Sequence, residues 1–192
     1  MNNYEYIIAS LPLPGVDSLD AEAVIAFVRS QLSPADESVL DLVLGAFDRE
    51  KLGREFYSAA LKNRNPFVRG FVSYDMLLRN TKVEYLNKAL DRPEGTDVLR
   101  FGEDDEDSGT DSEEKPAILA VLEQDDILGR EKGLDRLLWD KADELTRMHL
   151  FDLDVILAVV VKVMITDRWN KLDPATGREM FRNLVQEIRN TR

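Results

Sequence analysis

The sequence of 192 residues contains no cysteine and a single histidine, His149. Without cysteine the chain can form neither a disulfide nor a thiolate metal site, and the absence is compatible with a reducing compartment. One histidine also leaves the protein without a second strong nitrogen ligand for a transition metal. The composition therefore predicts no metal and no cofactor.

Long apolar runs are absent as well. The longest apolar stretch, Val155 to Ile165, is interrupted by Lys162 and is far shorter than the ~20 residues of a membrane-spanning helix. The first residues, Met1 to Leu13, include Glu5 and no basic side chain, unlike the positively charged start of a secretory signal. These features predict a cytoplasmic protein with no direct membrane insertion.

Positive charge is scarce relative to negative charge, with 25 lysines and arginines against 37 acidic residues and a net charge of -12. Such a field repels phosphate backbones, and no basic cluster offsets it, so we expect no nucleic-acid partner. Phosphate-binding glycine loops, GxGxxG motifs and GxSxG nucleophile elbows are also missing. The sequence predicts a protein that is not an enzyme by itself and has no catalytic residues.

Two small acidic arrangements are the remaining candidates for chemistry. His149 precedes Asp152 by three residues and Asp154 by five, a spacing from which a metal-dependent hydrolase site can be imagined. Aspartates before an apolar segment more often cap a helix, so we favour a structural role for them. Asp125 and Asp126 are adjacent, and on a helix their side chains would diverge by about 100° and could not share a proton.

Most of the chain shows the periodicity of amphipathic helices, with apolar residues recurring every three or four positions. The segments with this pattern are 19–32, 34–47, 52–61, 66–90, 118–128, 134–145, 155–169 and 174–188. Residues 4–11 suit a short strand or a first helical turn equally well. Residues 155–169 could also form a buried strand, but their length and the lack of partner strands favour a helix. We predict an all-α bundle of about seven helices.

Local signals mark the starts of several helices, because a capping side chain is followed by a proline at the first helical position. The pairs with this signal are Ser33-Pro34, Asn65-Pro66 and Asp173-Pro174. Asp17 or Ser18 is available to cap the helix that starts at residue 19. Asp152 or Asp154 is available to cap the helix that starts at residue 155.

Three glycines fall within or between the helical segments. Gly53 is expected to weaken the helix over 52–61, because glycine in a helix interior costs about 1 kcal/mol relative to alanine. Gly129 and Gly133 are expected to break the pattern between 118–128 and 134–145.

An acidic stretch separates the two halves of the chain. Residues 102–115 contain eight acidic side chains, one basic side chain and no apolar side chain, which gives a net charge of -7. Such a composition cannot offset the entropy of ordering, so we predict a flexible, disordered acidic loop. This divides the chain into an N-terminal helical half (1–99), the acidic loop (100–116) and a C-terminal helical half (117–192). Two lobes are one arrangement of the halves, and one compact domain is the favoured arrangement.

Each of the two tryptophans lies near an arginine in the sequence. Trp139 follows Arg136, and Trp169 follows Arg168. Tryptophan and arginine are enriched where proteins bind one another, so these four residues are the candidate partner-binding residues. Core packing of the two indole rings is the alternative, and we favour it somewhat over the interface.

Three stretches of the sequence resemble a known family. They are NYEYIIASLP at the start, NPFVRGFVSYDMLLRN from Asn65 to Asn80, and GREKGLDRLLWDKADELTRMHLFDLDVILAVVVKVMITDRW from Gly129 to Trp169. They resemble an uncharacterised bacterial family that is encoded in V-type (V/A-type) ATPase operons and is distantly similar to the C/d-type component of the central stalk. That component is a helical socket that couples the rotating shaft to the membrane ring and has no active site of its own.

The resemblance implies a non-catalytic accessory or central-stalk-like component of a bacterial V-type ATPase. It would bind the shaft and membrane-ring subunits from the cytoplasm, at the periphery of the inner membrane. The chain is shorter than the C/d-type socket and carries the acidic stretch, so no functional residues are transferred to it. A stand-alone helical adaptor, or an assembly factor that binds another protein, is the alternative.

Overall fold

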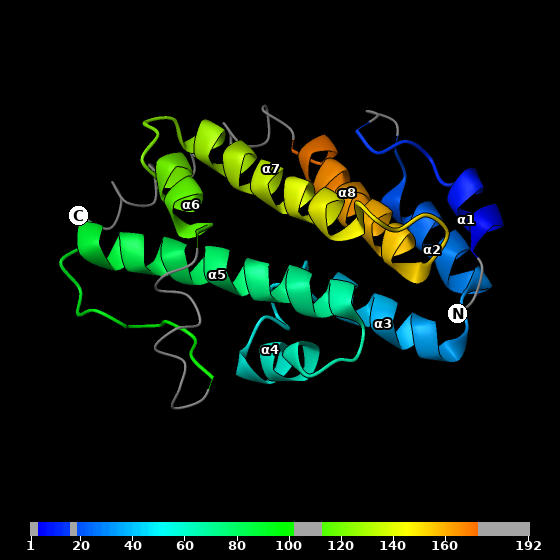
Figure 1. Ribbon diagram of the computed structural model, residues 1–192. Coiled ribbons are helices and arrows are strands. Elements are labelled where there is room, and N and C mark those ends of the chain that lie inside the picture. Colours follow the sequence, from blue (N-terminus) through cyan, green and yellow to red (C-terminus); the bar gives the residue numbers. More distant parts are fainter. Residues whose placement is uncertain (1–3, 16–18, 102–112, 173–192) are drawn as a thin grey trace, which may run out of the picture.

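The computed structural model describes residues 4–15, 19–101 and 113–172, and these ranges contain eight α-helices and no strand (Figure 1). The helices are α1 (Glu5–Ser10), α2 (Ala21–Gln31), α3 (Pro34–Gly45), α4 (Arg54–Leu61), α5 (Pro66–Ala89), α6 (Lys115–Leu122), α7 (Ile127–Thr146) and α8 (Leu153–Asn170). The predicted all-α fold is confirmed. Residues 5–10, for which strand and helix were both open, form a helix.

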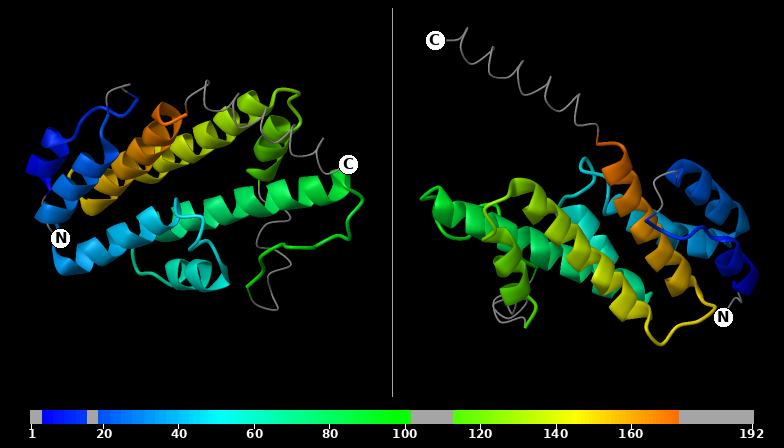
Figure 2. Two further views of the ribbon diagram at one scale, coloured as in Figure 1. Left: turned by 180° about the vertical axis from the view of Figure 1, so that it is seen from behind. Right: turned by 90° about the horizontal axis from the view of Figure 1, so that it is seen from above.

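The long helix α5 lies beside α7, and α6 packs against both of them toward the C-terminal end of α5 (Figures 1 and 2). Gly70 packs against Leu145, and Lys82 forms a 2.7 Å ion pair with Glu131, so the two helices run antiparallel. Helix α8 packs on the other side of α7 and also contacts α1, α2 and α3. The three N-terminal helices therefore gather at one end of the bundle, with α6 at the other end and α4 against α5 (Figure 1).

The caps predicted at two of the proline-started helices are present. Ser33 Oγ accepts a hydrogen bond from the backbone N–H of Asp36 at the start of α3. Asn65 Oδ1 accepts one from Val68 N at 2.8 Å at the start of α5. Both prolines occupy the first turn, where no backbone donor is needed. The pair Asp173-Pro174 and the helix predicted over 174–188 lie outside the described residues.

Two other cap predictions need correction or refinement. Helix α2 is capped by Asp20, whose Oδ1 accepts from Ala23 N at 3.1 Å, rather than by Asp17 or Ser18, which lie outside the described residues. Asp152 is the N-cap residue of α8, but its side chain makes no capping hydrogen bond there. Its Oδ2 atom contacts His149 Nδ1 instead.

The effect expected of Gly53 and the effect expected of Gly129 and Gly133 were both wrong. Gly53 is the N-cap residue of α4 rather than an interior residue. Gly129 and Gly133 both lie inside α7, and the break comes earlier, at residues 123–126. Asp126 accepts hydrogen bonds from Leu128 N and Gly129 N and so starts α7 ahead of the glycines. Gly133 is needed for close packing, since a Cβ there would lie 2.6 Å from Val121 Cγ1.

The central element of the larger hydrophobic core is α8. Its most deeply buried side chains, all with no exposed surface, are Ile156, Leu157, Val160, Val161 and Val163. Burial of each such side chain stabilises the folded state by about 1.5–3 kcal/mol. The position of α8 in the core explains why this helix is apolar on nearly every side. The same core includes Phe67 and Phe71 of α5 and Ile7 of α1, so it joins residues from both halves of the chain.

A smaller core fills the opposite end of the bundle, between α5, α6 and α7. Its buried residues are Tyr74, Leu77, Leu78, Ile118, Leu122 and Leu134. Leu138 packs against both cores, which links the two ends of the molecule. Within the described ranges, no helix has both the length and the apolarity to cross a membrane.

Most of the acidic stretch, residues 102–112, lies outside the described residues. Helix α6 begins at Lys115, directly after the last described residues of this stretch. Glu114 pairs with Lys141 at 2.6 Å, and Lys115 pairs with Glu84 at 2.9 Å. These ion pairs hold the start of α6 to α7 and α5, which composition alone could not predict.

Candidate functional site

The four candidate partner-binding residues come together at the crossing of α7 with the end of α8. Arg136 and Trp139 lie on α7, and Arg168 and Trp169 lie in the last turn of α8. A pocket of about 270 Å³ opens between the two helices. Its lining residues, which we call the tryptophan pocket, are Lys132, Asp135, Arg136, Trp139, Ile165 and Trp169.

The spacing of residues along α7 explains how one face of this helix lines the pocket. Lys132, Asp135, Arg136 and Trp139 follow one another at intervals of three, one and three residues, which places them on one side of an α-helix. Both indole rings are half-buried and pack in part against the larger core. The interface and core interpretations of the tryptophans are thus compatible, because each ring has one buried part and one part that borders the pocket.

Asp135 is the polar centre of the site. Its side chain is only 7% exposed, yet its Oδ2 atom accepts a 2.6 Å hydrogen bond from Trp169 Nε1 and a second bond from the Arg168 guanidinium. Burial raises the pKa of the Asp135 carboxyl above its ordinary value, and Arg168 and Trp169 partly offset this effect. The carboxylate therefore acts as an acceptor that fixes the end of α8 against α7.

Cations surround the two indole rings. Lys132 Nζ lies 5.5 Å and Arg168 Cζ lies 5.7 Å from the centre of the Trp169 ring. Lys162 Nζ lies 5.2 Å from the centre of the Trp139 ring. These distances are within the range of cation–π attraction, which contributes about 0.5–1 kcal/mol at exposed sites.

The arginines differ in where they point. Arg136 lines the pocket and pairs with Asp140 at 2.9 Å, one turn further along α7. Arg168 does not line the pocket, because it turns to Asp135 and lies 3.9 Å from Glu131. Sequence reasoning therefore found three of the lining residues and missed the others. The signal that could have found Lys132 and Asp135 is their helical spacing from Trp139.

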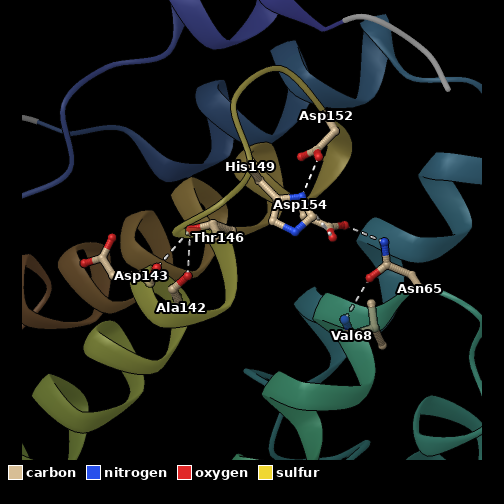
Figure 3. A network of polar contacts seen from close by, with 8 residues as sticks. All are labelled: Asn65, Val68, Ala142, Asp143, Thr146, His149, Asp152 and Asp154. Carbon is tan, nitrogen blue, oxygen red and sulfur yellow. Dashed lines mark hydrogen bonds and ion pairs between the residues drawn. The ribbon is translucent and has the colours of Figure 1, made fainter.

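The second candidate group, around His149, follows the C-terminal end of α7 (Figure 3). His149 Nδ1 is 2.5 Å from Asp152 Oδ2 and 3.8 Å from Asp154 Oδ2. Asp154 is buried, and its Oδ1 atom accepts a 2.6 Å hydrogen bond from the amide of Asn65. The contact with Asp152 raises the pKa of His149 above its ordinary value by stabilising the imidazolium.

These contacts tie three segments together. Asn65 caps α5 with its Oδ1 atom and donates from its Nδ2 atom to Asp154 in the first turn of α8 (Figure 3). The backbone N–H of Tyr4 donates to the carbonyl of Phe151 at 3.0 Å, which adds the segment before α1. A pocket of about 480 Å³ is lined by residues that include Tyr4, Asn65, His149, Asp152 and Asp154. Over the described part of the chain, no three histidine, cysteine or acidic side chains are grouped closely enough to hold a metal ion.

Asp125 and Asp126, the other adjacent acids, are exposed residues in the turn before α7. Asp126 uses its carboxylate to cap α7, where Gly129 N donates to Oδ2 at 2.8 Å. This pair lies before the helix rather than on it, and the capping contact gives Asp126 a structural role.

Comparison with known proteins gives one match. Residues 105–191, somewhat less than half of the chain, match the model of a family described as "Protein of unknown function (DUF2764)". The matched part includes α6, α7 and α8 and therefore every residue of the tryptophan pocket. No curated protein and no solved structure matches the chain. The C-terminal part of the chain thus resembles an uncharacterised family.

Proposed function

We propose that this protein is a non-catalytic, central-stalk-like or accessory component of a bacterial V-type ATPase and works by binding other subunits. The binding surface would be the tryptophan pocket with Arg168 beside it. The observation that carries the proposal is this grouping of two half-exposed indole rings and several cations at one place, since tryptophan and arginine dominate protein interfaces.

The arrangement of the three stretches that resemble the V-type ATPase operon family supports the same conclusion. They form α1, most of α5, and α7 with α8, and these elements lie against one another around the larger core. The resemblance therefore concerns one contiguous part of the molecule rather than scattered segments. In this role the protein would lie in the cytoplasm, at the periphery of the inner membrane.

A helical protein of this kind would contribute shape and contact surface rather than chemistry. The site around His149 fits this view in part, because the Asn65–Asp154 hydrogen bond joins α5 to α8 and the Tyr4–Phe151 hydrogen bond attaches the segment before α1. An assembly factor for the same complex would use the same surface but would leave once the complex is complete.

The proposal can be tested by sedimentation of detergent-solubilised membranes from the protein's own cells. A stoichiometric component will sediment with the catalytic subunits of the ATPase at a constant ratio. An assembly factor will be found only with incomplete complexes. Sedimentation of all the protein at its own mass of 21.9 kDa, with none beside the ATPase, would contradict both forms of the proposal.

A further inference from the structure

The size of the tryptophan pocket limits what it can hold. At about 270 Å³ it lies below the range of about 300–1,000 Å³ that is usual for sites that enclose a whole small molecule. Its lining consists of the two indole rings, the side chain of Ile165, the buried Asp135 and the exposed Lys132 and Arg136. A pocket of this size and lining suits a single apolar side chain, as at the centre of a protein interface.

The cations beside the pocket differ in whether they are paired with an acidic side chain. Arg136 is paired with Asp140, and Arg168 is paired with the buried Asp135. Lys132 is exposed and lies over the Trp169 ring, and no acidic side chain among the described residues is within ion-pair distance of it. Within the described part of the chain, the positive charge of Lys132 is therefore open to a ligand in the pocket.

We propose that the tryptophan pocket binds one apolar side chain of a protein partner, flanked by a carboxylate that pairs with Lys132. The inference rests on the proposed function, because it describes how the partner protein would be recognised. A single carboxylate is the fitting charge, since an acidic stretch would be repelled by a chain of net charge -12. The apolar side chain supplies the affinity, and the carboxylate supplies the orientation.

The two tryptophans make this proposal directly measurable. They are the only tryptophans of the chain, and both line the pocket. Tryptophan emission of the whole protein therefore reports on this one site. The probes are N-acetyl-leucine, which has an apolar side chain next to a carboxylate, and leucinamide, which has the same side chain next to a cation. Neither probe absorbs or emits where tryptophan does.

We expect N-acetyl-leucine to change the emission in a saturable way, and leucinamide to bind at least about tenfold more weakly. Lys132→Gln should weaken the binding of N-acetyl-leucine by about two- to fivefold, the range for loss of an exposed ion pair. Trp139→Ala should weaken it by about tenfold or more, with Trp169 as the remaining reporter. Lys88→Gln, which removes an exposed lysine of α5 away from the pocket, should leave binding unchanged.

Three results would overturn the proposal. One is equal or tighter binding of leucinamide, and another is an equal effect of Lys132→Gln and Lys88→Gln. The third is no response to either probe from protein whose circular dichroism and urea midpoint show that it is folded. Each of these outcomes concerns the chemistry of the pocket alone, and sedimentation with the ATPase would still decide the proposed function separately.

The same measurement distinguishes a protein partner from a segment of the same chain. Residues 173–192 follow directly after Leu172, and their apolar positions include Phe181 and Leu184. If Phe181→Asp shifts the emission of the unliganded protein to longer wavelength and tightens the binding of N-acetyl-leucine, the pocket belongs to this segment. That outcome would overturn the assignment of the pocket to a partner.

Discussion

The Nε1 atom of Trp169 lies 2.6 Å from Oδ2 of Asp135, so the indole in the last turn of α8 donates to a buried carboxylate of α7. Arg168 donates to the same oxygen from the neighbouring position. Two donors from one helix end thus meet one acceptor on the other helix. The two tryptophans consequently differ in role, because no hydrogen bond of Trp139 Nε1 is found among the described residues. Trp169 holds the pocket together, and Trp139 is the ring available for binding.

This difference predicts unequal effects of two matched substitutions. Trp169→Phe removes the donor to Asp135 and should lower the free energy of unfolding by about 1–3 kcal/mol, because a largely buried carboxylate loses a partner. Trp139→Phe removes ring area of similar size but no hydrogen bond and should cost less. Urea unfolding can be followed in each variant by the remaining tryptophan. Equal losses in the two variants would contradict the separate roles.

Because the pKa of His149 is raised in the folded protein, we expect stability to depend on pH in a specific direction. Its pKa is raised from 6.5 by the contact with Asp152, so the folded state binds the imidazole proton more tightly than the unfolded state. The stabilisation is therefore complete below about pH 6.5 and is lost as pH rises through the higher folded pKa. The melting temperature of the wild type should exceed that of His149→Gln at pH 6, and the difference should shrink by pH 8.

The single histidine allows the same pKa to be measured directly by NMR. We expect a value above 6.5 in the wild type and a lower value in Asp152→Asn, which removes the negative charge but keeps the shape of the side chain. A pKa at or below 6.5 in the folded wild type would show that the contact with Asp152 does not hold the imidazolium.

A side chain added at Gly133 should produce a steric clash between α6 and α7. The Cβ of Gly133→Ala would lie 2.6 Å from Cγ1 of Val121, whose branched side chain has little freedom to rotate. Overpacking of about 1–3 kcal/mol should exceed the gain of about 1 kcal/mol from helix propensity, so the variant should be less stable. In a Val121→Ala background the same substitution should become stabilising. Destabilisation of equal size in both backgrounds would show that Val121 is not the cause.

The side chain of Asn80 holds the segment that follows α5. Its side-chain amide donates to the carbonyl of Leu99 at 2.8 Å and accepts from the N–H of Leu99 at 3.0 Å. Asn80→Ala should remove both bonds, lower stability by about 1–2 kcal/mol and speed hydrogen exchange of the Leu99 amide. Asn80→Asp, which keeps the acceptor, should retain part of the protection. Unchanged exchange in Asn80→Ala would mean that other contacts hold this segment.

The helix starts were predictable from sequence because a cap is a local interaction. Ser33 and Asn65 satisfy backbone donors three residues away, and the prolines that follow them cannot continue a preceding helix. The break between α6 and α7 was placed too late, because Gly129 and Gly133 were expected to interrupt the helical pattern. The glycine is instead explained by the approach of Val121 from another helix, a tertiary cause that no local pattern reveals.

The candidate site was predictable only in part for the same reason. Arg136 and Trp139 share one helix, and Arg168 and Trp169 share another, but only the packing of α7 on α8 brings the pairs together. Asp135 was missed because its role depends on donors that lie more than 30 residues away in sequence. The contact of His149 with Asp152 spans only three residues, and this is why the spacing alone drew attention to it.

The most direct test of the proposed function is affinity capture of the tagged protein from its own cells, in parallel for the wild type, Trp139→Ala and Lys88→Gln. We predict that the ATPase shaft and ring subunits are retained by the wild type and by Lys88→Gln and are strongly reduced with Trp139→Ala. Absence of every ATPase component from the wild-type capture would contradict the proposed function.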